Sequence, residues 1–358
     1  MEIIRILAIN PGSTSTKIAV YQNTKLIFLK KITHESEDIL KFEKIADQYE
    51  YRKEIILKEL IAGNIDINSI NAVVGRGGLV KPIQSGVYEV NEALKNDLII
   101  GVLGEHASNL GGLIADDIAL SIPNAKAYIA DPVVVDELDD VARISGHPLF
   151  ERISIFHALN QKAIARTYAK SLGVKYEDLN LIIAHLGGGI SVGAHYKGRV
   201  IDVNQALNGE GPFSPERSGT LPVGELAKLC FSGKYTFKEV KRMITGRGGF
   251  VAYLGTNNTS EVQEKAKAGD KHAKLILDAM SYQIAKEIGA MSVVLKGKVD
   301  AILITGGIAY NEELIEYIKE RISFISRIIV FPGEDEMLAL AMNGLMILKG
   351  ELEAKVYV

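Results

Sequence analysis

Short apolar runs, separated by polar or glycine-rich turns, predict two similar sets of strands. Six runs fall into two groups of three: Ile3–Ile9, Lys17–Tyr21 and Leu26–Leu29, then Leu179–Ala184, Ile190–Tyr196 and Arg199–Val203. The first run of each group is almost continuously apolar, as is typical of a strand buried on both faces. Because the groups share the order strand, turn, strand, short hairpin and strand, they indicate an internal duplication.

Each half then continues with strands that alternate with helices. The further predicted strands are Asn71–Val74, Ala127–Ala130, Asp300–Ile304 and Arg327–Phe331. The clearest predicted helices are Ala158–Ser171, Glu261–Leu295 with room for a break, Asn311–Arg321 and Met337–Leu348. This alternation predicts α/β layers with largely parallel sheets, in which ligands bind beyond the carboxyl ends of the strands.

The length of 358 residues favours two domains. Pro148 interrupts helical pattern near the middle of the chain. We therefore expect a domain of residues 1–150 and a second of residues 151–336, with a cleft between them. The final helix and tail, residues 337–358, are expected to pack back on the first domain.

Composition and charge exclude several classes of protein. The net charge of −3 and the scattered Lys and Arg residues give no sign of a nucleic-acid surface. No apolar stretch reaches the roughly 18 residues of a membrane span, so no membrane partner is expected. The single cysteine, Cys230, cannot form an intrachain disulfide and is expected to be a buried core thiol. A cytoplasmic location agrees with this composition.

Three glycine-rich or hydroxyl-rich turns are candidate phosphate and nucleotide sites, since each follows a predicted strand. Small residues let a phosphate approach backbone N–H groups closely. The candidate residues are Asn10, Ser13, Thr14, Ser15 and Lys17 in the first turn, His185, Gly187, Gly188 and Gly189 in the second, and Gly306, Gly307, Ile308 and Asn311 in the third. The spacing of a P-loop is absent. Taken alone, the first turn could be an ordinary hairpin, the second a β-bulge or tight hairpin, and the third one of the common turns that contain a Gly-Gly pair.

Charged residues next to these turns are the candidates for chemistry. Arg76 lies between glycines at a strand end, and Arg217 lies in the irregular loop Gly209–Gly219. Asp131 follows a strand, and either begins a turn or serves a magnesium or phosphoryl site. One acid of the run 334–336 could serve a metal or cap the last helix. Most arginines and lone histidines are structural or solvated, and that alternative stays open here.

Taken together, these motifs resemble the acetokinase family, and within it the pattern of the butyrate kinases. The residues that carry the resemblance occur in family order along nearly the whole chain: Asn10–Lys17, Val74–Gly78, Phe156 and His157, His185–Ser191, Gly209–Gly219 and Ile304–Ala309. Pro11, Thr14 and Gly188 depart from the acetate kinase pattern toward that of butyrate kinases.

The resemblance implies an actin/hexokinase fold made of two duplicated ribonuclease-H-like domains with mixed sheets flanked by helices. It implies reversible transfer of a phosphoryl group from ATP, with Mg²⁺, to a short-chain carboxylic acid, giving an acyl phosphate and ADP. The implied catalytic residues are Arg76, Asp131, His157, Arg217 and Glu336. The implied substrate contacts are Arg76, Gly77, Gly78, His106, Phe156 and Arg217. Asn10, Asp131 and Glu336 would organise Mg²⁺, and a homo-oligomer is the family expectation.

Three alternatives remain at this point. An acetate or propionate kinase would use the same chemistry with a smaller pocket, a sugar or sugar-acid kinase would phosphorylate a hydroxyl, and an ATPase switch would phosphorylate no small acceptor. The two arginines favour an acidic substrate. We also expect Gly77 and Gly78 to leave room for a longer acyl chain than bulkier residues would.

Overall fold

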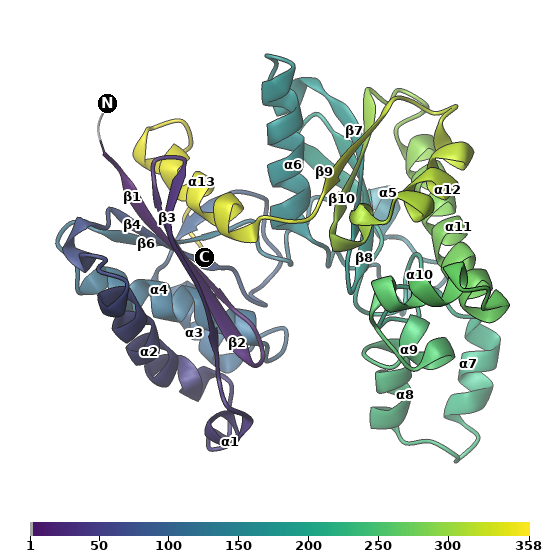
Figure 1. Ribbon diagram of the computed structural model, residues 1–358, viewed down its shortest axis with the longest axis horizontal. Helices are drawn as coiled ribbons and strands as arrows, with labels where there is room; N and C mark the ends of the chain where they lie inside the picture. The colour runs from purple at the N-terminus through teal and green to yellow at the C-terminus, as the bar shows by residue number, and fades with distance from the viewer. Residues whose placement is uncertain (1–2) are drawn as a thin grey trace. The chain divides into compact units, whose positions relative to one another are not determined.

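The computed structural model describes residues 3–358, which divide into two compact units (Figure 1). Unit 1 consists of the chain up to Val135 together with Asp335–Val358, and unit 2 is Asp136–Glu334. The boundary therefore lies earlier than the one expected after residue 150. The reason is that Glu137 and Asp139 are tied to unit 2, since Lys162 Nζ lies 2.7 Å from Glu137 Oε2 and Asp139 N donates to Ile201 O at 3.0 Å.

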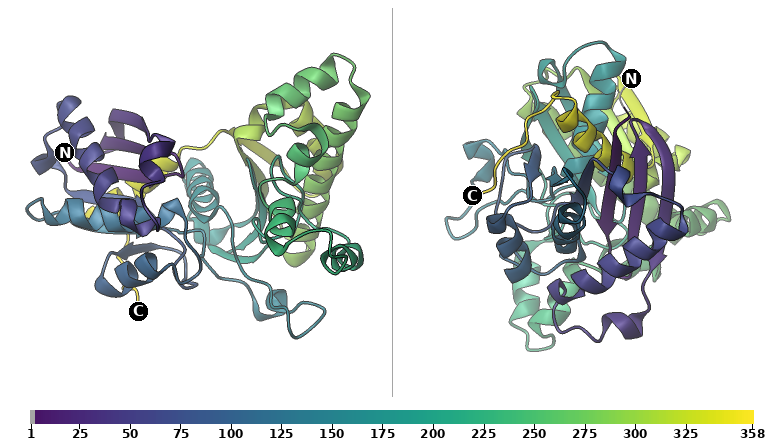
Figure 2. Two further views of the ribbon diagram at one scale, coloured as in Figure 1. Left: turned by 90° about the horizontal axis from the view of Figure 1, so that it is seen from below. Right: turned by 90° about the vertical axis from the view of Figure 1, so that its left-hand side faces the viewer.

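Unit 1 contains a six-stranded mixed sheet with the order β3-β2-β1-β4-β6-β5. Its strands are β1 (Arg5–Pro11), β2 (Ser15–Gln22), β3 (Lys25–Thr33), β4 (Ala72–Arg76), β5 (Val87–Glu89) and β6 (Lys126–Ala130). The first three form an antiparallel meander, which the right-hand view of Figure 2 shows in purple. Strand β4 pairs in parallel with both β1 and β6.

Unit 2 repeats this arrangement in a five-stranded sheet with the order β11-β10-β7-β8-β9. Its strands are β7 (Asn180–Leu186), β8 (Ile190–Tyr196), β9 (Arg199–Val203), β10 (Ala301–Gly306) and β11 (Ile328–Pro332). Again a meander of three antiparallel strands is followed by two strands in parallel, with β10 beside β7 and β11 beside β10. The predicted duplication and α/β class are therefore confirmed, as are the mixed sheets that the resemblance implied. The prediction of largely parallel sheets is wrong, because the meanders and the β5–β6 pair are antiparallel.

Helices cover both faces of the unit 1 sheet. They are α1 (Ser36–Ile39), α2 (Tyr49–Ala62), α3 (Glu92–Ile100), α4 (Leu110–Leu120) and α13 (Glu336–Leu348). A Cβ at Gly75 of β4 would lie 2.1 Å from Gly111 O of α4, whereas a Cβ at Gly344 of α13 would lie 2.7 Å from Val74 Cγ2. Because consecutive strand residues face opposite sides of a sheet, α4 and α13 lie on opposite faces.

Unit 2 has helices on both faces as well. They are α5 (Asp140–Arg143), α6 (Ala158–Ser171), α7 (Val223–Cys230), α8 (Phe237–Ile244), α9 (Gly249–Leu254), α10 (Thr259–Lys267), α11 (Lys271–Val294) and α12 (Glu312–Ile322). Ile182 and Ala184 of β7 belong to the apolar core with α11, whereas Leu181 and Ile183 belong to the core with α6. Figure 1 shows α6 and α11 on the two sides of this sheet.

The structure differs from the predicted elements at a few points. Several strands continue past their predicted apolar ends, so that Arg76 and Gly306 are the last residues of β4 and β10. The long predicted helix is broken into α10 and α11, with Gly269 at a φ of +96° between them. Cys230 is exposed, so the prediction of a buried thiol is wrong. Its helix, α7, buries none of its residues, because the apolar positions of this short element meet no covering layer.

Among residues 3–358, no helix is both long enough and apolar enough to cross a membrane.

The close approach of α4 to the end of β4 gives a prediction. A Cβ at Gly111 would lie 2.3 Å from Arg76 O, so Gly111→Ala should destabilise the protein by about 1–3 kcal/mol or more and displace Arg76. Gly289→Ala in α11 is the matched control, because its Cβ would meet no atom within 4 Å. The control should be neutral or more stable by about 0.5–1 kcal/mol. Urea unfolding of both variants makes the comparison, and equal stabilities would contradict the packing argument.

Candidate active site

Parallel pairing places three predicted residues at one edge of the unit 1 sheet. Ile9 of β1 pairs with Gly75 of β4, and Gly75 pairs with Ile129 of β6. Asn10, Arg76 and Asp131 lie at or just beyond these paired positions, where parallel sheets bind ligands. The expectation that strand ends gather the polar residues of this half is therefore met by the register of the strands.

Asn10, Arg76 and Glu336 form one connected cluster. Asn10 Nδ2 donates to Glu336 Oε2 at 2.5 Å, and Arg76 Nη1 lies 3.1 Å from Glu336 Oε1 and 3.3 Å from Asn10 Oδ1. The side chains of Arg76 and Glu336 are 27% and 14% exposed, so the ion pair is partly shielded from water. These contacts use Nη1, and a guanidinium carries further donors on Nη2 and Nε that can bind a second anion.

The structure separates the three acids that the sequence left open. Glu336 joins the cluster with Arg76, whereas Asp335 caps α13, where its Oδ1 accepts from Leu338 N at 2.8 Å. Glu334 belongs to unit 2 and lies 3.3 Å from His185 Nε2. Of the three, only Glu336 therefore shares a cluster with Asn10 and Arg76 in the described chain.

Asp131 is buried and has a strained backbone. It is 1% exposed, its φ is +37°, its Oδ1 accepts from Gly86 N at 2.8 Å, and its own N donates to Gly86 O at 3.0 Å. Positive φ is uncommon in residues other than glycine, and such strain is concentrated at functional sites. The two bonds to Gly86 hold the carboxylate in place.

An arginine that the sequence analysis did not identify, Arg52, binds the Asn10–Lys17 turn through hydrogen bonds. Arg52 of α2 is 1% exposed and donates to Gly12 O at 2.7 Å, to Ser13 O at 3.0 Å and to Thr16 Oγ1 at 3.2 Å. Burial lowers the pKa of the Arg52 guanidinium to about 10, so it stays charged at neutral pH. Because Arg52 binds the carbonyl oxygens of the turn, it orders the backbone that presents the exposed residues.

The predicted turn residues divide by exposure. Ser13, Thr14 and Lys17 are exposed and Ser15 is half-buried, whereas Thr16 is buried against His34, with 2.8 Å between Thr16 Oγ1 and His34 Nε2. The exposed hydroxyls and the lysine are therefore available to a ligand, while Thr16 serves the fold.

In unit 2, His157 and His185 stack on each other. Their ring centroids are 4.0 Å apart with an interplanar angle of 22°. His185 is the second-last residue of β7 and is 2% exposed, and His157 immediately precedes α6. The Oγ atom of Ser191, in β8, lies 2.8 Å from His157 Nδ1. The two predicted histidines are thus brought together at the glycine turn that follows β7.

Arg217 also lies at this turn. Its guanidinium packs so closely on Gly189 that a Cβ there would be 1.9 Å from Arg217 Nη1. Ser214 of the same loop donates its hydroxyl to Gly188 O at 2.6 Å, and Arg217 Nη1 donates to Ala206 O at 2.5 Å. Burial lowers the pKa of Arg217, with Glu216 acting in the opposite direction. The third glycine of the turn is therefore required by the arginine.

A pocket of about 340 Å³ opens beside the glycine turns of unit 2. Its lining includes residues of two predicted turns and two further side chains: Gly187, Gly188, Gly307, Ile308, Asn311, Tyr310 and Glu334. Asn311 caps α12 by accepting from Leu314 N at 3.0 Å. Gly306 is required for the turn, because a Cβ there would lie 2.2 Å from Leu186 O.

Of the remaining predicted substrate residues, Gly77, Gly78 and Phe156 lie in protein-packed surroundings, whereas His106 is exposed. A Cβ at Gly77 would lie 2.5 Å from Pro132 Cβ, and one at Gly78 would lie 2.5 Å from Asn109 Oδ1. The space beside these glycines is thus filled by the protein itself, which contradicts the idea that it accommodates an acyl chain. His106 begins a short 3₁₀ helix and bonds Ser108 locally, and Phe156 is buried.

The polar atoms present fit a nucleotide better than a protein-bound metal. Within the described residues, His185 Nδ1 and Asn311 Nδ2 are buried without a hydrogen-bond partner, and both residues adjoin the glycine turns. Residues 3–358 place no group of three or more His, Cys, Asp or Glu side chains where it could hold a metal ion.

Solved structures share this fold. The chain superimposes on acetate kinase from Porphyromonas gingivalis with a TM-score of 0.79 at 20% identity, covering 96% of this chain and 100% of that one. A propionate kinase from Francisella tularensis gives a TM-score of 0.74 at 19% identity, covering 95% and 98%. The fold is thus that of the acetate and propionate kinases.

Sequence relatives define the family. A sequence model of the acetokinase family matches residues 151–326. Butyrate kinase 1 and butyrate kinase 2 from Clostridium acetobutylicum are 59% and 58% identical to this chain, with 99% of each chain covered. The chain therefore belongs to the acetokinase family.

His34 gives a prediction for pH dependence. Burial first, and the nearby Arg52 charge second, lower the pKa of His34 to about 4, whereas an unfolded histidine titrates near 6.5. Between these values the unfolded chain binds a proton that the folded chain does not. Stability should therefore fall with decreasing pH from 6.5 to 4, by up to about 1.4 kcal/mol per unit from this residue.

Urea unfolding of the native protein and His34→Gln across this pH range tests the prediction. The glutamine does not titrate, so the variant should lose stability less steeply. The difference between their free energies of unfolding at pH 8 measures the effect of the altered packing alone. Parallel slopes in the two proteins would show that His34 is not responsible.

Proposed function

We propose that this protein reversibly transfers the γ-phosphoryl group of ATP to butyrate or a short branched-chain fatty acid, giving an acyl phosphate and ADP. The observation that carries the proposal is the 59% identity to butyrate kinase 1 over 99% of both chains. The arrangement of Arg76, Asn10 and Glu336 supports an anionic substrate, since a positive side chain is fixed at the ligand-binding edge of the sheet.

The reaction joins two anions, and charge is its main difficulty. A carboxylate is ionised at neutral pH, so its oxygen attacks the γ-phosphorus without giving up a proton. The new bond is carboxylate oxygen to phosphorus, and the broken bond joins that phosphorus to the oxygen that leaves with ADP. Positioning and charge stabilisation therefore supply the catalysis.

Arg76 would bind the substrate carboxylate, and its ion pair with Glu336 would fix the guanidinium before the substrate arrives. Because Asn10 also binds Glu336, the loss of either partner would let the arginine turn. Asn10, Asp131 and Glu336 carry oxygen atoms suited to accept hydrogen bonds from water around Mg²⁺.

In unit 2, the glycine turn 187–189 would approach the phosphates of ATP, and the pocket beside Ile308 and Asn311 would take the nucleoside. Arg217 would stabilise charge on the transferred phosphoryl group. His157 would donate a hydrogen bond to that group. When bound, Mg²⁺ would neutralise phosphate charge.

Acetate or propionate as the preferred acid is the second candidate. It is kept because the space beside Gly77 and Gly78 is filled by Pro132 and Asn109, so these glycines do not define a longer pocket. The preference for butyrate thus rests on the relatives. A sugar kinase is disfavoured, because a hydroxyl acceptor has no charge for Arg76 to bind.

The proposed reaction gives a prediction about the acceptor. Purified protein with Mg-ATP and acids from acetate to hexanoate should give an acyl phosphate, trapped as the hydroxamate, with the highest kcat/KM near butyrate or isobutyrate. Each CH₂ contributes roughly 0.8 kcal/mol when buried, so acetate should be weaker by about tenfold or more. A maximum at acetate would support the second candidate. ADP release with glucose or glycerol, and no hydroxamate, would reject acyl transfer.

The proposed role of Arg76 gives another prediction. Arg76→Ala should lower kcat/KM for butyrate by on the order of 10³-fold, since the carboxylate then approaches ATP without its counter-charge. Arg5→Ala is the matched control, because Arg5 belongs to the same unit but bonds Ser69 and Gln22 at the start of β1. Its kcat/KM should remain within about twofold of the native value. Equal effects of the two variants would exclude a specific role for Arg76.

A further inference from the structure

A chain of buried hydrogen bonds leads from the interior of unit 2 to His157. Its central residue is Gln161 of α6, which is fully buried. Its side-chain Nε2 lies 3.1 Å from Ser191 O and 2.9 Å from Ser191 Oγ. A carbonyl oxygen only accepts hydrogen bonds, so the NH₂ end of the Gln161 amide must face Ser191. Its Oε1 is therefore the atom that faces the other way.

The orientation of Gln161 determines the tautomer of His195. His195 Nε2 lies 2.8 Å from Gln161 Oε1, which can only accept, so Nε2 carries the hydrogen. Tyr176 OH lies 2.6 Å from His195 Nδ1. In a neutral ring the second nitrogen accepts, so Tyr176 donates to it. The direction of each bond in this part of the chain is thus fixed.

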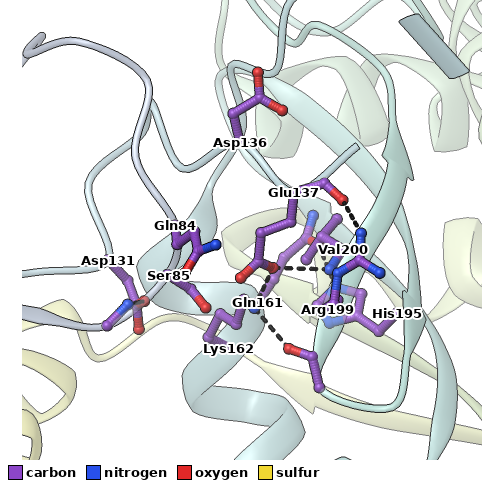
Figure 3. Close-up of polar contacts among 12 residues, drawn as sticks. Gln84, Ser85, Asp131, Asp136, Glu137, Gln161, Lys162, His195, Arg199 and Val200 are labelled. Carbon is purple, nitrogen blue, oxygen red and sulfur yellow. Dashed lines mark hydrogen bonds and ion pairs between the residues drawn. The ribbon is translucent and has the colours of Figure 1, made fainter. Parts of the chain in front are cut away.

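His195 is held neutral by its surroundings. It has no exposed surface, and burial lowers its pKa well below the ordinary value, with the nearby Lys162 charge adding to the effect and Glu137 opposing it. Lys162 is itself fully buried, and its Nζ bonds Glu137 Oε2 at 2.7 Å and Gly198 O at 2.8 Å. Figure 3 shows Glu137, Gln161, Lys162 and His195 close to one another. The Lys162–Glu137 pair therefore fixes the charge around the histidine.

The last bond reaches His157. Ser191 Oγ receives a hydrogen bond from Gln161 Nε2 and a weaker one, at 3.4 Å, from His157 N. A hydroxyl has two lone pairs and one hydrogen, so the hydrogen is left for His157 Nδ1, 2.8 Å away. His157 Nδ1 therefore accepts, and its Nε2 carries the hydrogen.

We propose that the chain Tyr176–His195–Gln161–Ser191 is a positioning device that holds His157 as the Nε2–H tautomer, so that Nε2 rather than Nδ1 is the donor atom of this ring. The role in catalysis rests on the proposed function, in which His157 donates to the transferred phosphoryl group. Ser191, Gln161, His195 and Tyr176 are positioning residues, since they act through His157.

The test measures the tautomer and the rate separately. In protein with ¹⁵N-labelled histidine, the His157 signals, assigned by their loss in His157→Gln, should show a protonated Nε2 and an unprotonated Nδ1. Ser191→Ala removes the donor to Nδ1 and should give a mixture of tautomers. It should also lower kcat by about tenfold, with the KM for butyrate changed less than about twofold, the size expected from one hydrogen bond.

Two further variants provide controls. Ser191→Thr keeps a hydroxyl and should restore the native tautomer. Ser281→Ala is the matched control, since Ser281 is also buried in unit 2 but its hydroxyl bonds only the Leu277 carbonyl of its own helix at 2.9 Å. It should leave the His157 signals and kcat as in the native protein.

Tyr176→Phe tests the far end of the chain without touching Ser191. Loss of its O–H removes the donor to His195 Nδ1, but the Ser191 carbonyl still fixes Gln161, so the His157 signals should shift less than in Ser191→Ala. A native His157 protonated at Nδ1, native signals in Ser191→Ala, or an equally large shift in Tyr176→Phe would overturn the proposal. If no acid gives an acyl phosphate, the proposed function fails, while the tautomer measurement still decides whether the chain orients His157.

Discussion

The parallel pairing of β4 with β1 and β6 is the constraint on which the site of unit 1 depends. It brings Asn10, Arg76 and Asp131 to one edge from parts of the chain that are far apart in sequence. The pairing of β10 with β7 and β11 does the same for the glycine turns of unit 2. Glycines allow the covering helices to approach these strands, as at Gly75 and Gly111. Backbone geometry thus precedes side-chain chemistry in both units.

Much of this architecture could be predicted from the sequence. The apolar runs gave β8, β9 and α6 with their observed limits, because each is bounded by a turn or by residues of different periodicity. Strand ends were predicted too short, since the ladder of backbone bonds continues through polar residues such as Arg76. The early boundary at Val135 could not be predicted, because it depends on the ion pair between Glu137 and Lys162, which are distant in sequence.

The site was predictable as a set of motifs but not as a set of contacts. Gly77 and Gly78 show the difference, because a glycine leaves space that either a ligand or the protein can fill, and here Pro132 and Asn109 fill it. Arg52 and Gln161 carry no local signal, since each lies in an ordinary helical pattern and binds residues distant in sequence. Buried polar groups of this kind are recognised only when their partners are known, although an unsatisfied one would be costly.

The return of α13 to unit 1 has a consequence for how the protein is made. This helix covers the face of β4 that carries Val74 and supplies Glu336 to Arg76, yet it follows the whole of unit 2 in the sequence. Unit 2 is continuous in sequence and is complete before α13 is synthesised. The nascent chain therefore passes through a stage in which its second-synthesised unit is able to fold while the first still exposes an apolar sheet face. Chaperone binding during synthesis should be directed at that N-terminal face, since exposed apolar strands promote aggregation.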